Sequence, residues 1–558
     1  MRSSFSSKNS LFSVLLPYWM SKEKWGAWGL LLLLIFLLLI RTALQVVFLI
    51  YGGELTSALA AQQSDRFLQA TLIFAGILVV SVPFASIASY VRSKLGLYWR
   101  TWLTRDYLDR YLSEQTFYKL RLSGDIDNPD QRIEEDVRSL TQESLKLFEI
   151  LLESFFQLLG FAGLLWSISQ PLTAVLLVYS IVGSAIAALF FGKPLVYINA
   201  EQLRHEADFR YSLARIRKNT EAIALYRGEQ QEHAQSSKRF SNVFNNFTRL
   251  LRWQLGLNLF QNHYRYATYI IPGIILAPRL FAGELEIGDV TQAGSAFTLM
   301  LSVLALIVLQ LQQLTKLGAA SQRLQAFTAA LDSYRSPLLA PNVITRQSGS
   351  ALTIESLSLV TPDDSQQLVH DLSLALPRGE SLLIVGPSGV GKSSLLRAIS
   401  GLWRTGQGDI ICPQSIAFIP QKPYLPAGPL KDVLRYPLSA ISLEPQLESA
   451  AVSATFRQDL EQVNLPELAN YSLERSITQS LSLVEQQRLA FARVLLHSPE
   501  YVILDEATSA LDLRNETRLY QQLQQNSITP ISVGHRPSLK NYHQHFLTLS
   551  ANGSWKYL

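Results

Sequence analysis

The sequence contains a series of long apolar segments, and no other feature constrains its fold as strongly. A helix needs about 20 residues to span a bilayer, and the apolar segments run over about 26–51, 67–91, 147–168, 172–192, 254–280 and 290–311. Charged residues make up only 17% of the 558 residues, against about 25% in a typical soluble chain. A soluble helical bundle would need several buried helices of about 25 residues, which is unusual. We therefore expect residues 1–332 to form a membrane domain of six transmembrane helices.

Lysine and arginine are concentrated in three of the segments that flank these spans. Residues 1–25 carry four, residues 92–146 carry ten and residues 192–253 carry eleven, whereas 51–66 and 279–289 carry one each. The positive-inside rule then places both termini and the two long connections in the cytoplasm. Because this topology accounts for most of the basic residues, we expect membrane lipid and not nucleic acid as a partner. The two long connections are rich in helix formers, so we expect the spanning helices to continue beyond the bilayer.

Ionisable residues inside the apolar segments are costly, and each suggests a functional site. Glu149 and Glu153 stand one turn apart, and we interpret them as members of structural ion pairs. Arg41 lies in the first segment. Arg265 lies in the fifth, after a run of polar residues that includes Asn258 and His263. For this run two interpretations stay open, a polar cavity that contacts a solute and a structural contact.

A second domain begins near residue 351, after a polar segment at 333–350 that we expect to be a linker. Residues 351–558 have the composition of a soluble α/β domain, and the single cysteine of the chain, Cys412, excludes a disulfide scaffold. An apolar strand at Ser381–Val385 is followed by a glycine-rich loop and then by apolar helix formers. This order is the P-loop pattern, in which backbone N–H groups and a helix N-terminus surround phosphate.

The P-loop predicts a nucleotide site. Its residues are Gly386, Pro387, Ser388, Gly389, Val390, Gly391, Lys392, Ser393 and Ser394. Lys392 can reach the β- and γ-phosphates of ATP, and the Ser393 hydroxyl can ligate Mg²⁺. Further along, the strand Tyr501–Leu504 ends in Asp505 and Glu506. We expect Asp505 to hold Mg²⁺ and Glu506 to orient or deprotonate the attacking water.

A third short strand, at Pro530–Val533, leads to His535, which could contact the γ-phosphate. Taken in order, these motifs resemble those of ATP-binding-cassette (ABC) transporters. Gln421 resembles the Q-loop glutamine, residues 481–488 the signature motif, and residues 509–512 the D-loop. The resemblance implies that Gln421 serves catalysis and Mg²⁺ binding and that His535 is the switch histidine. It also implies that nucleotide contacts Ser482, Glu485 and Asp512.

The membrane half is similar to one subgroup, ABC subfamily D and its bacterial relatives, which include peptide and vitamin B12 carriers. The matching stretches include Arg41-Thr42, residues 99–104, residues 127–133 and residues 219–229. The resemblance implies an exporter-type helical membrane domain joined to an α/β P-loop cassette. It also implies a half-transporter that works as a dimer, which we expect to be a homodimer. The expected location is the plasma (inner) membrane of a bacterium.

The chain departs from the family pattern at two positions. The signature normally has glycine where Val484 stands, and a β-branched side chain would crowd a phosphate there, so we expect slow ATP hydrolysis. The aromatic residue that usually stacks on adenine is absent, and Thr361 stands near its place.

We therefore expect ATP-driven transport of an amphipathic or bulky solute, such as a fatty acyl-CoA, a peptide or a corrinoid. Two alternatives are a proton-driven carrier with a weakened cassette and a nucleotide-sensing membrane regulator.

Overall fold

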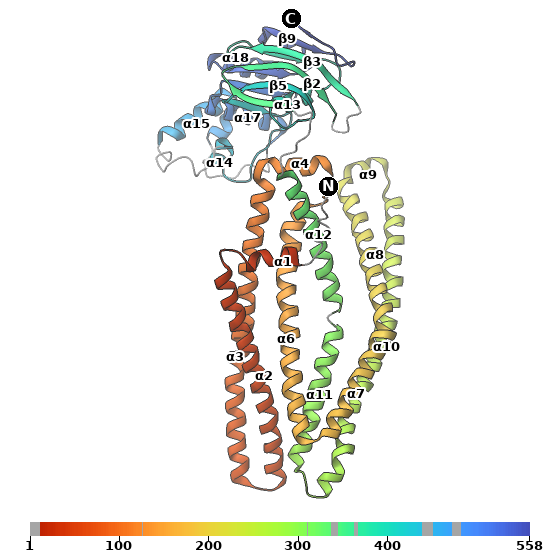
Figure 1. The fold of residues 1–558 in the computed structure, drawn as a ribbon. Helices are drawn as coiled ribbons and strands as arrows, with labels where there is room; N and C mark the ends of the chain where they lie inside the picture. Colours follow the sequence, from red (N-terminus) through yellow and green to blue (C-terminus); the bar gives the residue numbers. More distant parts are fainter. Residues whose placement is uncertain are drawn as a thin grey trace, which may run out of the picture. The chain divides into compact units, whose positions relative to one another are not determined.

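The chain divides into two compact units, Met1–Leu338 and Leu339–Leu558, which Figure 1 draws in one ribbon. The computed structural model describes residues 12–124, 126–309, 311–335, 344–361, 366–437, 450–470 and 481–558. Residues 336–343, in the middle of the segment expected to be a linker, lie outside these ranges. A helix ends before them at Arg335, and a strand begins soon after them at Thr345.

Every regular element described in the first unit is a helix. Its elements are α1 (Phe12–Trp19), α2 (Lys24–Ala60), α3 (Ser64–Leu112), η1 (Ser113–Gln115), α4 (Thr116–Ser123), α5 (Pro129–Gln131), η2 (Arg132–Asp136), α6 (Val137–Ile168), α7 (Gln170–Ile186), η3 (Ala187–Gly192), α8 (Lys193–Lys218), α9 (Thr220–Tyr226), α10 (Glu229–Phe281), α11 (Ile287–Leu309) and α12 (Leu311–Arg335). The segments η2 and η3 are π-helical turns that lead directly into α6 and α8. Chain direction is therefore kept across both turns.

Several of these helices are much longer than a bilayer requires. Helix α3 has 49 residues and α10 has 53, whereas about 20 are enough to cross. The expectation that the helices continue beyond the apolar segments is confirmed. Among the described residues, three helical stretches are long and apolar enough to cross a membrane, Lys24–Ala60, Ser64–Ser123 and Pro129–Ile168. The unit is thus a helical membrane region, and the count of six spans stays a prediction.

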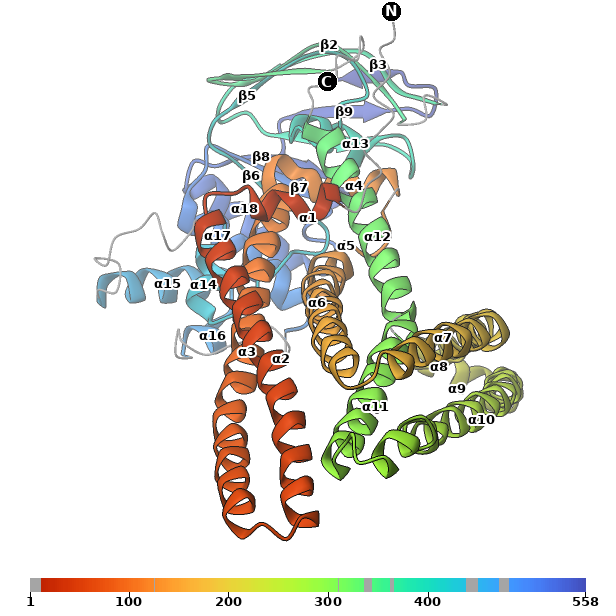
Figure 2. The ribbon, with the colours of Figure 1, turned by 60° about the horizontal axis from the view of Figure 1, so that its bottom comes forward.

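The helices of this unit form two groups that meet along α11. One group contains α2, α3 and α6, and the other contains α8, α9 and α10. Helices α2 and α3 make an antiparallel hairpin, and α8 lies beside α10 with α9 at their turn (Figures 1 and 2). Helix α11 packs against α2 and α6 on one side and against α10 on the other. A Cβ atom on Gly288 would lie 2.1 Å from the Gly53 carbonyl oxygen. Glycine is therefore needed where α11 crosses α2 so closely.

The second unit contains two sheets and a helical part. Its elements are β1 (Thr345–Gly349), β2 (Leu352–Val360), β3 (Gln367–Leu376), β4 (Leu382–Val385), α13 (Lys392–Ile399), β5 (Gly406–Pro413), β6 (Ile416–Ile419), α14 (Leu430–Arg435), α15 (Ala450–Gln462), α16 (Pro466–Ala469), α17 (Leu483–His497), β7 (Tyr501–Asp505), α18 (Leu513–Gln525), β8 (Thr529–Val533), η5 (Pro537–Tyr542), β9 (His545–Leu549) and β10 (Trp555–Tyr557). This is the α/β domain that the sequence predicted.

The larger sheet has the strand order β10-β9-β4-β8-β7-β6. Its strands β4, β6, β7, β8 and β9 are parallel, and β10 is an antiparallel edge. Parallel strands that are buried on both faces consist of continuous apolar runs, as Tyr501–Leu504 does. The smaller sheet has the order β1-β5-β2-β3, and β1 pairs in parallel with β5. Strand β1 occupies part of the expected linker, because pairing with β5 provides partners for its backbone N–H and C=O groups.

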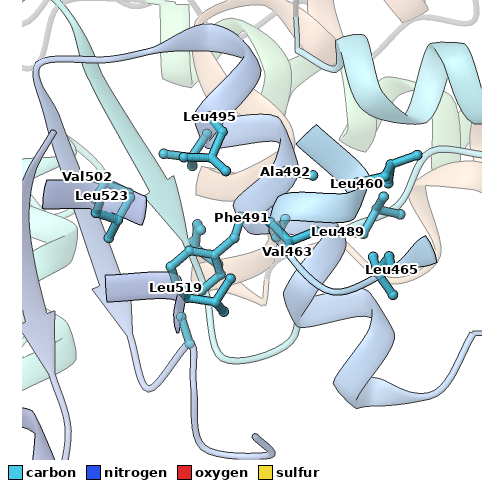
Figure 3. Packing of buried hydrophobic residues seen from close by; sticks show 14 of the residues in the cluster. Leu460, Val463, Leu465, Leu489, Phe491, Ala492, Leu495, Val502, Leu519 and Leu523 are labelled. Atoms are coloured by element: carbon cyan, nitrogen blue, oxygen red, sulfur yellow. The ribbon is translucent and has the colours of Figure 1, made fainter. Parts of the chain in front are cut away.

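The helical part of the second unit packs around α17. Leu489, Phe491 and Leu495 on that helix are buried among side chains from α15, β7 and α18 (Figure 3). Because α17 is fixed on several sides, its N-terminus is held in a constant orientation to the rest of this helical part. That N-terminus carries the signature motif.

Candidate nucleotide site

The glycine-rich loop between β4 and α13 has the backbone that a phosphate cradle requires. Gly386, Gly389 and Gly391 have φ values of +152°, +84° and +99°, a region that side chains with a Cβ rarely occupy. A Cβ on Gly386 would lie 2.5 Å from the Leu549 carbonyl oxygen, so β9 also requires glycine there. Pro387, Ser388 and Gly389 are exposed, whereas Val390 is buried beneath them. The tip of the loop is therefore open to a ligand.

Lys392 and Ser393 begin helix α13 directly after the loop. The Lys392 Nζ donates hydrogen bonds to the carbonyl oxygens of Gly386 (2.9 Å) and Pro387 (2.7 Å). Burial lowers the pKa of Lys392, and the charges of Glu506 and Asp505 oppose that shift. The ammonium group is thus held at the loop, where an anion would relieve the cost of its burial.

Asp505 ends strand β7 and faces α13. The Ser393 hydroxyl donates a hydrogen bond of 3.3 Å to its Oδ1. Burial raises the pKa of Asp505, and the bond from Ser393 partly offsets the shift. A carboxylate and a hydroxyl in this arrangement are the hard oxygen ligands that Mg²⁺ prefers, so these residues fit the expected cation.

Glu506 lies between the two other residues expected to serve catalysis. The Gln421 Nε2 donates a hydrogen bond of 2.8 Å to one carboxylate oxygen, and the His535 Nε2 lies 3.6 Å from the other. The Glu506 backbone has φ +48°, a strained value for a residue other than glycine. Its N–H donates to the Val533 carbonyl oxygen at 3.0 Å. The carboxyl ends of β6, β7 and β8 thus bring three predicted residues together.

The signature motif forms the N-terminus of α17. Ser482 is the N-cap, and its hydroxyl accepts from the Glu485 N–H while the Glu485 carboxylate accepts from the Ser482 N–H (2.7 Å). This capping box satisfies backbone donors that would otherwise be open. Ser482 and Leu483 are exposed. Val484 packs against the hydrophobic cluster of the helical part.

The described hydrogen bonds and ion pairs of one chain do not join Ser482, Glu485 or Asp512 to the P-loop. Asp512 precedes α18 and accepts a hydrogen bond from Asn515. Ser394, one residue after Ser393, lies half-buried in the first turn of α13. The predicted residues therefore form two groups, one around the P-loop and one around the start of α17 and α18.

Gln487 links these two groups and was missed in the sequence. It is fully buried. Its Nε2 donates to the Gln421 carbonyl oxygen at 3.0 Å, and its Oε1 accepts from the Ala510 N–H at 3.3 Å. One side chain thus connects the signature helix to the Q-loop and the D-loop. Its position five residues after Ser482 is the only signal that the sequence offers.

A buried carboxylate, Glu516, was also missed. It is 0% exposed and accepts hydrogen bonds from Thr508 (3.0 Å), from Ser538 and from Arg536 (3.4 Å). Arg536 follows the switch histidine directly and also donates to the Ser509 carbonyl oxygen at 2.8 Å. The network connects the D-loop to the loop that carries His535. The adjacency of Arg536 to His535 was a signal, whereas Glu516 lay in an ordinary polar helix.

The expected adenine position is only partly described. Thr361 follows strand β2 and pairs with Gln366 across residues 362–365, which lie outside the described residues. The Trp403 Nε1 donates to the Val360 carbonyl oxygen at 3.1 Å. An aromatic ring therefore lies beside the end of β2, although it comes from a different part of the sequence.

The two glutamates of the third apolar segment form ion pairs, as expected. Glu153 pairs with Arg41 at 2.9 Å, and Glu149 pairs with Arg92. Each pair joins α6 to a neighbouring helix, α2 in the first case and α3 in the second. The cost of these charges within the apolar segments is therefore reduced by their partners.

The membrane unit contains a cavity with polar and apolar lining, which lies at Arg41 and Glu153 and not at the run around Arg265. The cavity has a volume of about 490 Å³ and is lined by residues of α2, α6 and α11, among them Arg41 and Glu153. Arg265 is not among its described lining residues; it is exposed on α10 and donates to Asn262 at 3.0 Å. Both interpretations of the polar run around Arg265 thus stay predictions.

Comparison with known proteins gives a consistent result for both units. The model of the family ABC transporter transmembrane region 2 matches residues 11–281, and that of the family ABC transporter matches residues 369–509. An uncharacterized ABC transporter ATP-binding protein of Synechocystis sp. is 42% identical over 96% of this chain and 82% of its own length. The chloroplastic ABC transporter D family member 2 of Arabidopsis thaliana is 37% identical over 97% of this chain and 85% of its own length. The lysosomal cobalamin transporter of Mus musculus is 30% identical, with 97% and 94% covered.

Proposed function

Because this chain belongs to the ABC transporter family, with a membrane region of the region 2 type, we propose that two copies form an ATP-driven pump. The pump moves an amphipathic or bulky solute. Each chain has one membrane unit and one cassette, so a second copy supplies the other half. A homodimer needs no further chain.

The observation that carries this proposal is the position of Glu506. Its carboxylate lies between Gln421 and His535, next to the Asp505 and Ser393 pair. A carboxylate in that place can accept a proton from water that attacks the γ-phosphate. His535 can then contact the phosphate, and Lys392 can bind its charge.

Mg²⁺ supplies charge neutralisation for the phosphates when it is bound. Ser393 and Asp505 would hold it, with Gln421 close by through its bond to Glu506. These are oxygen ligands from three separate segments, which suits a cation that keeps several waters.

The second group of predicted residues belongs, in this proposal, to the nucleotide of the other copy. Ser482 is exposed at the N-terminus of α17, where backbone N–H groups favour an anion. Glu485 and Asp512 are proposed to lie close to that nucleotide as well. In a head-to-tail dimer, Ser482 of one cassette would contact the γ-phosphate held by Lys392 of the other.

The proposed membrane topology has six spans and cytoplasmic termini. Helices α2, α3, α6, α7, α10 and α11 supply the spans, and the basic residues of the connections support the orientation. The proposed location is the plasma (inner) membrane of a bacterium.

The test is solute-stimulated ATP hydrolysis in proteoliposomes. The wild type should hydrolyse ATP, and Lys392→Ala should lose at least about 100-fold because the phosphate loses its cation. A panel of one acyl-CoA, one peptide and one corrinoid should include a solute that stimulates the wild type. Hydrolysis that survives Lys392→Ala, or that no solute in a broad panel changes, would contradict the proposal.

A further inference from the structure

The cavity in the membrane unit combines polar and apolar walls. It has a volume of about 490 Å³, and helices α2, α6 and α11 line it. Apolar side chains such as Phe48, Phe161 and Leu299 form one part of the wall. The polar part consists of Arg41, Gln45, Glu153, Ser154, Gln157 and Ser302. An amphipathic molecule could thus contact both kinds of surface at once.

An ion pair with an attached amide lies at the polar wall. Arg41 and Glu153 are 2.9 Å apart, and their side chains are 30% and 15% exposed. The Gln157 Nε2 donates to Glu153 at 3.0 Å and to the Gln45 Oε1 at 2.9 Å. Charged side chains within a membrane span are costly and are retained where they serve a polar pathway.

A second ion pair on α6 lies outside the cavity and serves as a comparison. Glu149 lies one turn before Glu153 and pairs with Arg92 of α3, and neither residue is among the described lining residues of the cavity. This pair joins α3 to α6. Of these two described pairs, only Arg41 and Glu153 are therefore placed to meet a solute in the cavity.

The polar wall is neutral over this pair, because one cation balances one anion. Hydrogen-bond donors of Arg41 and acceptors of Glu153 lie side by side. A solute group that offers an acceptor beside a donor, as an amide does, matches this pattern. A polyanion without an amide, such as an alkyl diphosphate, would find a single cation that is already paired.

We propose that this cavity binds the amide groups of an amphipathic solute, through Arg41 and Glu153. The proposal rests on the proposed transport function and specifies its solute class. Peptides and corrinoids both carry amides on an apolar body, and the experiment distinguishes them.

The experiment measures binding and ATP hydrolysis separately, with the full chain in lipid nanodiscs. The probes are an acetylated trileucine amide, cyanocobalamin and farnesyl diphosphate, an amphipathic polyanion without an amide. We expect one of the two amide probes to bind and to stimulate hydrolysis, and farnesyl diphosphate to do neither. The amide probe that binds shows whether the solute is a peptide or a corrinoid.

The test variant is Arg41→Met with Glu153→Leu, which removes both the donors and the acceptors, and the matched control is Arg92→Met with Glu149→Leu. We expect the dissociation constant of the amide probe to rise at least about tenfold in the test variant and less than about twofold in the control. Ser302→Phe fills the cavity from α11, leaves both members of the ion pair in place and should weaken binding as strongly. It keeps the test open if the double variant does not fold.

Each outcome bears on one of the two proposals. Tighter binding of farnesyl diphosphate than of either amide, or equal binding by wild type and both variants, would overturn the amide site and leave the pump intact. Binding of an amide without any effect on ATP hydrolysis would overturn the pump and leave the site.

Discussion

In the nucleotide site the polar side chains around the P-loop follow buried strands, whereas in the membrane cavity they come from the middle of long helices. Asp505 and Glu506 end β7, and Lys392 follows β4 by a loop. Arg41, Glu153 and Ser302 come from three helices that are far apart in the sequence. Strand ends bring residues together by local rules, but helix faces meet only through packing. Each of these nucleotide-site residues can therefore be placed from its own strand, whereas the cavity depends on how three separate helices pack.

The largest expected effect tests the local site. Glu506→Gln should lower kcat for ATP hydrolysis at least about 100-fold, because the side chain can no longer accept a proton. ATP binding should persist. Steady-state hydrolysis and retention of labelled ATP on the protein measure both.

The matched control is Glu500→Gln, one residue before the same strand begins, where Glu500 pairs with Arg378. It should change kcat less than about twofold. A similar loss in both variants would mean that Glu506 acts through the fold of β7 and not through its carboxylate.

A smaller effect on kcat is expected from Glu516, which the sequence motifs did not identify. Glu516→Gln should lower kcat roughly tenfold with little change in KM, because Arg536 loses a charged partner beside the D-loop. Glu467→Gln, which changes an exposed carboxylate on α16, is the control. Unchanged kcat in a folded Glu516→Gln variant would mean that the hydrogen-bond network around Glu516 stabilises the fold and does not affect hydrolysis.

Substitution of Val484 in the signature motif should change the rate of ATP hydrolysis by a few-fold. If Val484 crowds the phosphate, Val484→Gly should hydrolyse ATP faster than the wild type in liposomes. Val484 also packs on the helical core, so Val484→Ala separates loss of the β-branch from loss of helix propensity. A glycine variant that is no faster would refute slow hydrolysis by crowding.

The smallest effect concerns stability of the cassette. Burial lowers the pKa of His543 to about 4, below its usual value of about 6.5. Between these values the unfolded chain binds a proton that the folded chain does not, so stability falls as pH falls. From about pH 7.5 to about pH 5.5 the loss is about 1 kcal/mol.

Melting of the full chain in detergent measures this loss. The decrease in Tm over that pH range should be smaller in His543→Gln than in the wild type. His233→Gln, which changes an exposed histidine of the membrane unit, should leave the decrease unchanged. An equal decrease in all three would show that other groups cause it.

The sequence predicted the α/β cassette and its P-loop side because each motif is contiguous and follows a strand. It predicted the ion pairs of Glu149 and Glu153 from the cost of charge in a span. It marked Arg41 as a candidate functional residue but could not locate the cavity, since three separate helices form it. Glu516 and Gln487 were missed because their partners lie on other segments.

ATP-dependent movement of a labelled solute across proteoliposomes tests the central claim most directly. The solute is the amide probe that binds, and ATP is added outside, where it reaches only outward-facing cassettes. The account predicts net movement in one direction with wild type and none with Glu506→Gln. Movement that continues with Glu506→Gln, or that a pH gradient drives without ATP, would contradict it.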